Sequence, residues 1–230
     1  GMNSDELSLC VERHATSKLP DDDLIDIRYL GFRGEALPSI GAVSRLSITT
    51  RTSNSTEAWR LNVEGGQVYA PTPAAHPPGT RIEIRDLFYA TPARLKFLKT
   101  ARTEMNRVEE IIKRLAMAYP HIGFTLSNEA RRRLDLSGEQ GDLFSARINR
   151  LSNIMGRDFA DNAIPVEAER DGSKLSGYIG VPTFNRGNST LQFLFVNGRP
   201  VSDRMLYGAL RGAYRDFLAS DRYPVVALFL

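Results

Sequence analysis

The sequence has little or none of several features that define common protein classes. Its single cysteine, Cys10, excludes an intramolecular disulfide framework and suits a reducing compartment. We expect it to be a small buried or half-buried residue rather than a reactive thiol. No apolar run approaches the roughly 20 residues that span a bilayer, and no signal-peptide pattern is present. We therefore expect a cytoplasmic protein with no membrane partner.

The chain also lacks the familiar signatures of metal and nucleotide sites. The histidines His14, His76 and His121 are far apart in the sequence and show no metal-ligand spacing, so we assign no metal to them. Nothing matches the P-loop pattern G-x-x-x-x-G-K-[ST], and no G-x-G-x-x-G follows an expected strand. These absences exclude the two nucleotide sites that are easiest to read from a sequence.

Composition and charge set only loose bounds. A chain of 230 residues with 42% hydrophobic content can bury a real core, in one large or two small domains. The net charge of +3 is mildly basic, and at this size such a balance often reflects only a solvated surface. Charge by itself therefore does not predict nucleic-acid binding.

What the chain does have is a pair of glycines three positions apart, Gly31 and Gly34. Glycine lets a backbone turn tightly and approach another group. Residues 35–40 can open a helix, whose first N–H groups could bind an anion, and Lys18 adds positive charge upstream. This chemistry indicates a phosphate-binding loop. The spacing alone favours an ordinary turn, because turns use the same residues.

The first part of the chain interleaves expected strands and helices. Strands are predicted at residues 46–50, 56–63 and 81–85, and four prolines mark 70–79 as a loop. Helices are predicted at 5–18 and 103–119, the second capped by Thr103 and stopped by Pro120. A hairpin at 124–136 would close this part. Its three consecutive arginines, 131–133, are expected on a solvated surface, since neighbouring strand residues face opposite ways.

A polar stretch with two glycines, residues 137–142, is the best candidate for a linker. A second part follows, with helices predicted at 143–156 and 204–219. Strands are predicted at 163–168, 174–181, 191–196 and 223–230, and Asn197-Gly198 is a strong tight-turn signal. The sequence thus predicts an α/β (α+β) fold of two sandwiches, each a sheet with helices on one face.

Five separated strings carry a family resemblance. They are HATSK at residues 14–18, LGFRGEAL at 30–37, GT at 79–80, DLFYATPAR at 86–94 with KFL at 96–98, and FVNGR at 195–199. Together, and in this order, they closely resemble the MutL family of DNA mismatch repair ATPases. The resemblance covers essentially the whole chain.

The resemblance implies a GHKL-type ATPase sandwich at residues 1–137, lacking its N-terminal motifs. A domain similar to domain 2 of ribosomal protein S5 would follow at 143–230, lacking its C-terminal end. A mobile lid would hold ATP, with Thr16, Ser17 and Lys18 matching one lid segment. The residues that match the glycine-rich segment around the phosphates are Gly31, Phe32, Arg33, Gly34, Glu35, Ala36 and Leu37. Thr80 matches a threonine near the adenine end of the pocket.

Three of these side chains also allow other roles. Glu35 looks like a catalytic acid in isolation, but we expect its side chain to brace the lid while its backbone faces phosphate. Arg33 could contact phosphate or pair with an acid in the lid, and we favour the pairing. We expect His14 to be a structural hydrogen-bonding residue beside the lid.

The departures from the family pattern matter as well. The family's catalytic glutamate, its Mg²⁺-binding asparagine and a lysine that reaches the γ-phosphate match no residue here. We therefore expect ATP and Mg²⁺ as cofactors of the intact protein, with no catalytic residue, no metal and no bound cofactor in this stretch alone. Gly1 could be the last glycine of the family's D-x-G-x-G motif; alternatively, Gly1-Met2 is an expression scar. The residues do not separate these readings.

The resemblance also implies partners. They are DNA, MutS, a second copy of the protein, and a downstream nuclease or helicase that varies within the family. Because the second domain of the family contributes to a basic DNA groove, we propose Arg199 and Arg204 as contacts to the DNA backbone. Such contacts bind phosphates without reading sequence, as a protein acting at any mismatch requires.

Two alternatives from other classes are retained. One is a type II topoisomerase ATPase region, which shares both domain types but should lack the strings at 31–37 and 195–199 as written here. The other is a non-enzymatic DNA-binding or scaffold module, in which the glycine pair only forms a turn.

Overall fold

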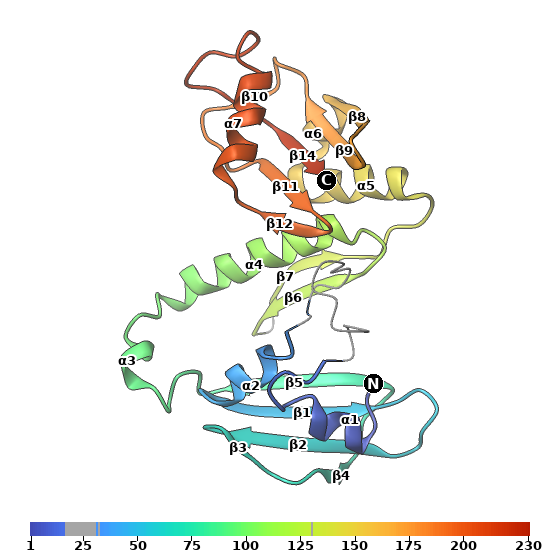
Figure 1. Cartoon of the computed structure of the whole chain (residues 1–230), viewed down its shortest axis with the longest axis vertical. Helices are drawn as coiled ribbons and strands as arrows, with labels where there is room; N and C mark the ends of the chain where they lie inside the picture. The colour runs from blue at the N-terminus through green and yellow to red at the C-terminus, as the bar shows by residue number, and fades with distance from the viewer. Residues whose placement is uncertain (17–30, 32, 130) are drawn as a thin grey trace. The chain divides into compact units, whose positions relative to one another are not determined.

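The computed structural model describes residues 1–16, 31, 33–129 and 131–230. They form two compact units, Gly1–Lys99 and Thr100–Leu230 (Figure 1). Within this described part of the chain, no helix is long and apolar enough to cross a membrane.

The first unit, as far as it is described, is a five-stranded antiparallel sheet in the order β3-β2-β1-β5, with β4 also paired to β2. Its elements are α1 (Ser4–Leu9), α2 (Ala36–Gly41), β1 (Arg45–Arg51), β2 (Ala58–Glu64), β3 (Gln67–Val68), β4 (Thr72–Ala74), β5 (Gly79–Arg85) and α3 (Pro92–Leu95).

The core of the first unit follows from alternation along its strands. Successive side chains of a strand point to opposite faces, so Leu46 and Ile48 of β1 share one face and are buried. They pack with Leu61 of β2, with Leu7 of α1 and with Leu37 of α2 in one apolar cluster. The alternating pattern read from the sequence is therefore confirmed, and it decides which face the two helices cover.

Two sequence predictions in this unit are corrected. The helix expected from residue 5 to 18 ends at Leu9, and the described residues beyond it, up to Thr16, are turn and irregular. The stretch expected to be a loop, 70–79, contains β4 and the first residue of β5. Pro73 fits there because β4 is bonded only to β2, and an edge strand tolerates a residue without an N–H.

The second unit holds a five-stranded sheet in the order β12-β11-β14-β9-β8, in which β11 and β14 are parallel and the other neighbours antiparallel. Its elements are α4 (Ala101–Ala118), β6 (Phe124–Asn128), β7 (Arg131–Leu136), α5 (Leu143–Met155), α6 (Arg157–Asp161), β8 (Ala163–Arg170), β9 (Ser173–Gly180), β10 (Asn185–Arg186), β11 (Gln192–Val196), β12 (Arg199–Val201), α7 (Arg204–Ala213), β13 (Tyr223–Pro224) and β14 (Val226–Phe229).

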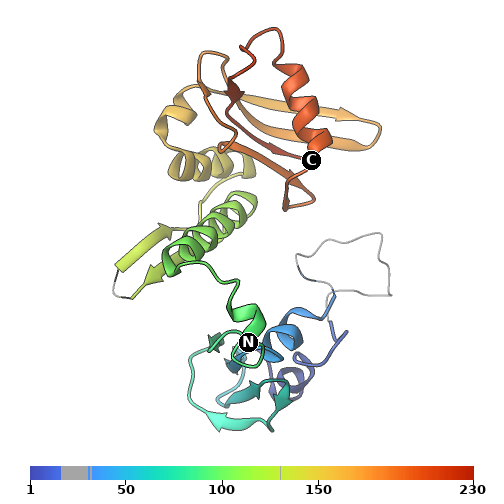
Figure 2. The ribbon, with the colours of Figure 1, turned by 90° about the vertical axis from the view of Figure 1, so that its left-hand side faces the viewer.

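Helices cover both faces of this second sheet. On β14, Val226 packs with Leu210 of α7, while the next residue, Ala227, packs in a cluster with Leu151 of α5 and Phe159 of α6. Figure 2 shows the orange-red helix α7 and the yellow helix α5 on opposite sides of the sheet. The expectation of helices on one face is wrong for this unit, because β14 is apolar on both of its faces, as central strands buried on two sides are.

Two helix limits in this unit also differ from the predictions. The N-cap of α4 is Thr100, whose side chain accepts a hydrogen bond from the Thr103 N–H at 3.3 Å, so the helix begins earlier than expected. Helix α7 ends at Ala213, and turns replace the helix expected up to residue 219.

The β6–β7 hairpin is fastened to α4 by an ion pair of Arg133. Arg133 lies 2.8 Å from Glu109, which also pairs with Lys113 at 2.7 Å. The Lys113 ammonium, followed by the Arg133 guanidinium, holds the pKa of Glu109 below its usual value. A second arginine of this run, Arg132, pairs with Asp135 at 2.6 Å. These contacts agree with the expected hairpin surface and give two of its three arginines a structural partner.

The two compact units divide between Lys99 and Thr100, so α4 and the hairpin pack with the second unit. Met117 of α4 shows why, because it is fully buried in the same cluster as Leu151 and Phe195. The domain limits expected from the linker, 1–137 and 143–230, do not coincide with this division and stay a prediction.

Candidate functional site

A cavity of about 790 Å³ opens in the first unit beside the glycine pair. The residues that line it are Gly1, Met2, Glu6, Leu9, Cys10, Ala15, Thr16, Gly31, Arg33, Gly34, Glu35, Ala36 and Leu37. Seven of these belong to the two segments predicted from the sequence: Thr16 to the first, and Gly31 with the run from Arg33 to Leu37 to the second. Ser17, Lys18 and Phe32 lie outside the described residues.

The two segments are joined at Gly34. The backbone N–H of His14 donates to the Gly34 carbonyl at 3.2 Å, and the His14 Nδ1 lies 3.6 Å from a carboxylate oxygen of Glu35. Gly34 has a φ of +59°, and a Cβ there would collide with the Ala15 carbonyl oxygen and lie 2.8 Å from the Ala15 nitrogen. Only glycine allows this close approach, so the second glycine of the pair is required by the geometry.

His14 and Glu35 contact each other, and the roles expected for them beside the lid stay predictions. His14 itself has a φ of +65°, a left-handed conformation that costs a non-glycine residue about 1–3 kcal/mol. The contact between His14 and Glu35 is exposed, and exposed pairs stabilise by only about 0–1 kcal/mol. The hydrogen bond from the His14 N–H to the Gly34 carbonyl contributes a comparable amount, about 0.5–1.5 kcal/mol.

Helix α2 places its first turn at the cavity. Its N-cap residue, Glu35, makes no side-chain capping hydrogen bond. The N–H groups of a first helical turn have no acceptor inside the helix, so those at Ala36 and Leu37 need a partner from elsewhere. Further along α2, Leu37 and Ile40 pack against the core cluster of the first unit. The loop is thus anchored to the core on one side and faces the cavity on the other.

Thr80 does not line the cavity but is connected to its wall by hydrogen bonds. Its hydroxyl lies 2.9 Å from the buried Thr50 hydroxyl, which accepts the Met2 N–H at 2.8 Å, and Met2 is part of the cavity wall. Thr80 is not among the described residues that line the cavity, so its expected position near the adenine stays a prediction.

Gly1 and Met2 take part in the fold. A Cβ at Gly1 would collide with the Arg51 carbonyl oxygen, so this backbone approach also requires glycine. Met2 packs against the core cluster of the first unit. Both residues line the cavity, and the hydroxyl of Thr50, near the end of β1, holds the Met2 N–H there.

Several lining residues were not selected from the sequence: Met2, Glu6, Leu9, Cys10 and Ala15. Three of them, Glu6, Leu9 and Cys10, have the i, i+3 and i+4 spacing that places residues on one face of a helix. This spacing is the sequence signal that could have identified them. Cys10 is half-buried, as expected, and burial raises the pKa of its thiol. Its Sγ donates to the Leu7 carbonyl at 3.1 Å.

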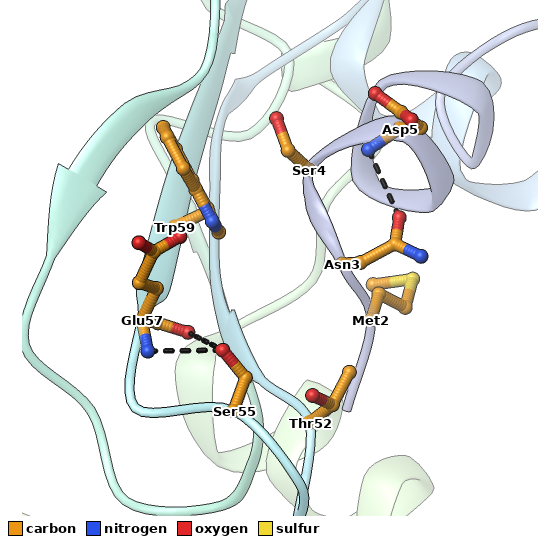
Figure 3. Close-up of a pocket in the computed structure, with 8 residues that line it drawn as sticks. All are labelled: Met2, Asn3, Ser4, Asp5, Thr52, Ser55, Glu57 and Trp59. Carbon is orange, nitrogen blue, oxygen red and sulfur yellow. Dashed lines mark hydrogen bonds between the residues drawn. The ribbon is translucent and has the colours of Figure 1, made fainter.

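A second, smaller cavity of about 350 Å³ lies at the start of α1 (Figure 3). It is lined by Met2, Asn3, Ser4, Asp5, Thr52, Ser55, Glu57 and Trp59. The Ser55 hydroxyl bonds to the backbone N–H of Glu57 at 3.0 Å, and Asn3 caps α1 by accepting from the Asp5 N–H at 3.0 Å. Ser55 thus serves a turn and Asn3 a helix cap, and none of the described site residues predicted from the sequence lines this cavity.

The two candidate DNA contacts lie in the second unit, around a tight turn. Asn197 and Gly198 have φ of +48° and +73°, which fits the expected two-residue turn between β11 and β12. Arg199 follows as the first residue of β12 and is half-buried. Arg204 is the first residue of α7; it is exposed and forms no ion pair with a described residue.

Among residues 1–16, 31, 33–129 and 131–230, no group of three or more His, Cys, Asp or Glu side chains could hold a metal ion. The cavity beside the glycine pair offers backbone donors and the side chain of Arg33.

Comparison with known proteins confirms the resemblance along the whole chain. All 230 residues align with the DNA mismatch repair protein MutL of Paramagnetospirillum magneticum at 60% identity, and with that of Rhodospirillum rubrum at 61%. The chain belongs to the MutL family. Residues 151–230 also match the family described as "DNA mismatch repair protein, C-terminal domain".

The chain spans 38% and 37% of the length of these two MutL relatives. Among solved structures, the Aquifex aeolicus MutL ATPase domain complexed with ADP is similar with a TM-score of 0.66 and 29% identity. The match covers 85% of this chain and 70% of that one. The mixed α/β fold predicted from the sequence is thereby confirmed as the fold of a MutL ATPase domain.

Proposed function

We propose that the 790 Å³ cavity of the first unit binds the phosphates and ribose of ATP in the full-length protein. The observation that carries this proposal is that two segments, separated in sequence, line one cavity in a chain of the MutL family. The similar Aquifex aeolicus domain was solved with ADP, which supports the same ligand class here.

The residues present fit such a ligand. Pockets for small molecules measure about 300–1,000 Å³, so the volume is suitable. The first-turn N–H groups of α2 would donate to phosphate oxygens, while Arg33 would offset their charge or pair with an acid of the lid. Mg²⁺, when bound, would neutralise charge on the transferring phosphoryl group.

Hydrolysis needs a base that positions water, and we propose that this stretch alone binds nucleotide weakly and does not turn it over. In the full-length protein, Thr16 to Lys18 and Arg33 to Leu37 would close over the nucleotide as a lid. Ordering of a segment by γ-phosphate contacts is a known switching device.

The cellular function that we propose is mismatch repair in the bacterial cytoplasm, at the nucleoid. ATP-driven ordering of the lid would bring two copies together, and hydrolysis would release them. The protein would couple mismatch recognition by MutS to a downstream nuclease or helicase, while holding DNA by its backbone. The membership in the MutL family supports this assignment over a topoisomerase or a scaffold module.

Cys10 provides a direct test of the pocket. In the full-length protein, we expect millimolar ATP with Mg²⁺ to slow alkylation of Cys10 at least about fivefold, because the thiol lines the cavity and is already half-buried. The measurement is mass spectrometry of the Cys10 peptide over time, at a pH high enough to form thiolate against the raised pKa of this thiol.

The outcomes separate the alternatives. Saturable protection that requires Mg²⁺ supports the ATPase, and denatured protein, in which ATP should protect nothing, is the control. If millimolar ATP neither protects Cys10 nor binds by equilibrium dialysis, the non-enzymatic module is the better account.

The proposed DNA contacts give a second prediction. Reversing the charge with Arg204→Glu should weaken binding of a random-sequence duplex about tenfold at low salt and reduce the salt slope by about 1, because one phosphate contact is lost. Arg199→Glu should act similarly. The matched control is Arg170→Glu, which reverses another exposed charge, at the β8–β9 hairpin of the same unit. If Arg204→Glu and Arg170→Glu bind DNA alike, the assignment of Arg204 is wrong.

A further inference from the structure

The stretch expected to be a linker, residues 137–142, is fastened at its start to the loop after α4. The Glu139 N–H donates to the Pro120 carbonyl at 2.9 Å, and the His121 ring nitrogen Nδ1 lies 3.0 Å from the Glu139 carbonyl. A Cβ at Gly138 would collide with the His121 carbonyl oxygen. The two segments therefore touch along their backbones, which a freely moving linker would not do.

Arg150 of α5 joins both segments. Its Nη2 lies 2.7 Å from the Pro120 carbonyl oxygen, 2.9 Å from that of Ile122 and 2.7 Å from that of Ser137. The side chain is fully buried. One guanidinium thus connects the end of α4, the end of β7 and the middle of α5.

Burial of the Arg150 guanidinium is unfavourable in free energy, so its retention calls for a structural role. Within the described residues, the Nε and Nη1 of Arg150 have no hydrogen-bond partner, and no carboxylate bonds to the guanidinium. Burial lowers the pKa of Arg150, and the nearby Glu139 carboxylate offsets part of that effect. Burying a cation without an anionic partner is unfavourable. A methionine could fill the same volume, but it could not donate to three carbonyl groups.

We propose that Arg150 locks residues 137–142 in place, so that α4, the β6–β7 hairpin and α5 behave as one rigid body. Composition predicts a linker at 137–142, and the contacts of Arg150 would hold that linker fixed. Any hinge about which parts of the protein move must then lie outside residues 119–155. The division of the chain into units between Lys99 and Thr100, rather than within 137–142, agrees with this inference.

The test is hydrogen exchange of the full-length protein, read on peptides that cover residues 137–142. Wild-type protein should show protection at Glu139, whose N–H is bonded to Pro120. In Arg150→Met, exchange there should accelerate between about 10- and 100-fold, because hydrogen bonds to a charged donor are lost. The readout is the exchange of 137–142 relative to that of β9 and β14 in the same unit.

Arg147→Met is the matched control. Arg147 lies one turn earlier on α5 and is half-buried, but it lies over the Phe229 ring at 4.1 Å and donates to Ser176 at 2.9 Å. Its loss should leave exchange at 137–142 within about threefold of wild type. If Arg150→Met does not fold, Gly138→Ala is the second variant. Its Cβ would collide with the His121 carbonyl oxygen, so it should accelerate exchange at 137–142 in the same way.

Three results would overturn the proposal. One is free exchange of residues 137–142 in the wild type. Another is an equal acceleration of 137–142 and of β9 and β14 in Arg150→Met, which would indicate a general loss of stability. The third is an unchanged exchange rate of 137–142 in a folded Arg150→Met or Gly138→Ala protein.

Discussion

Gly34→Ala in the full-length protein should weaken ATP binding about 100-fold. The added Cβ would collide with the Ala15 carbonyl oxygen and lie 2.8 Å from the Ala15 nitrogen, both backbone atoms that cannot rotate away. The left-handed φ of +59° adds about 1–2 kcal/mol of strain for any residue with a Cβ. Together these effects should displace Ala15 and Thr16 from the cavity wall, and a loss of about 2.7 kcal/mol corresponds to 100-fold in affinity.

The control for Gly34 is Gly66→Ala. Gly66 lies in the same unit and also has a positive φ, of +93°, but a Cβ there would only meet the Ala42 Cα at 3.8 Å, an ordinary contact. Its substitution should cost stability without changing nucleotide affinity, which isothermal titration calorimetry would measure. Equal affinities of Gly34→Ala and wild type would mean that the glycine loop does not grip the nucleotide.

Gly177→Ala should destabilise the second unit by about 4 kcal/mol. Gly177 lies in β9 between β8 and β14, opposite Val166 and Leu228. A Cβ there would collide with the Ala227 carbonyl oxygen and lie 3.0 Å from the Leu228 Cα, and its φ is +138°. Strain at such a φ costs about 1–3 kcal/mol, and forced overpacking costs a similar amount.

Gly172→Ala separates these two costs. Gly172 has a φ of +76° at the turn between β8 and β9, and a Cβ there would meet no atom within 4 Å, so only strain of about 1 kcal/mol is expected. Urea unfolding followed by circular dichroism would compare the two variants. A loss no larger for Gly177→Ala than for Gly172→Ala would show that β9 and β14 are not packed as closely as described.

Much of the fold could be read from local patterns. The alternation around Leu46 and Ile48 predicted β1 and its buried face, and Asn197-Gly198 predicted the turn before β12. These signals are local, because side-chain period and turn chemistry depend only on neighbouring residues. Helix limits were harder to place: Thr103 looked like the N-cap of α4, but Thr100 occupies that position with Thr103 as its donor.

The residues of the candidate site were likewise only partly predictable from the sequence. Gly34 and Glu35 were selected from a motif, whereas Cys10 and Met2 were not, because they enter the cavity wall only when α1 and β1 have packed together. Thr80 was selected from a motif as well, but its hydroxyl bonds to Thr50 instead of lining the cavity.

By itself, the sequence determined the family, the mixed α/β class and the two segments around Thr16 and Gly34, because these reside in residue identity and short-range spacing. Only the tertiary structure decided that Gly34 must be glycine, that helices cover both faces of the second sheet, and that residues 137–139 contact the loop after α4. Each of these depends on atoms brought together from distant positions, such as Arg150 with Pro120 and Ser137. No pattern along one segment encodes that proximity, since it arises from packing.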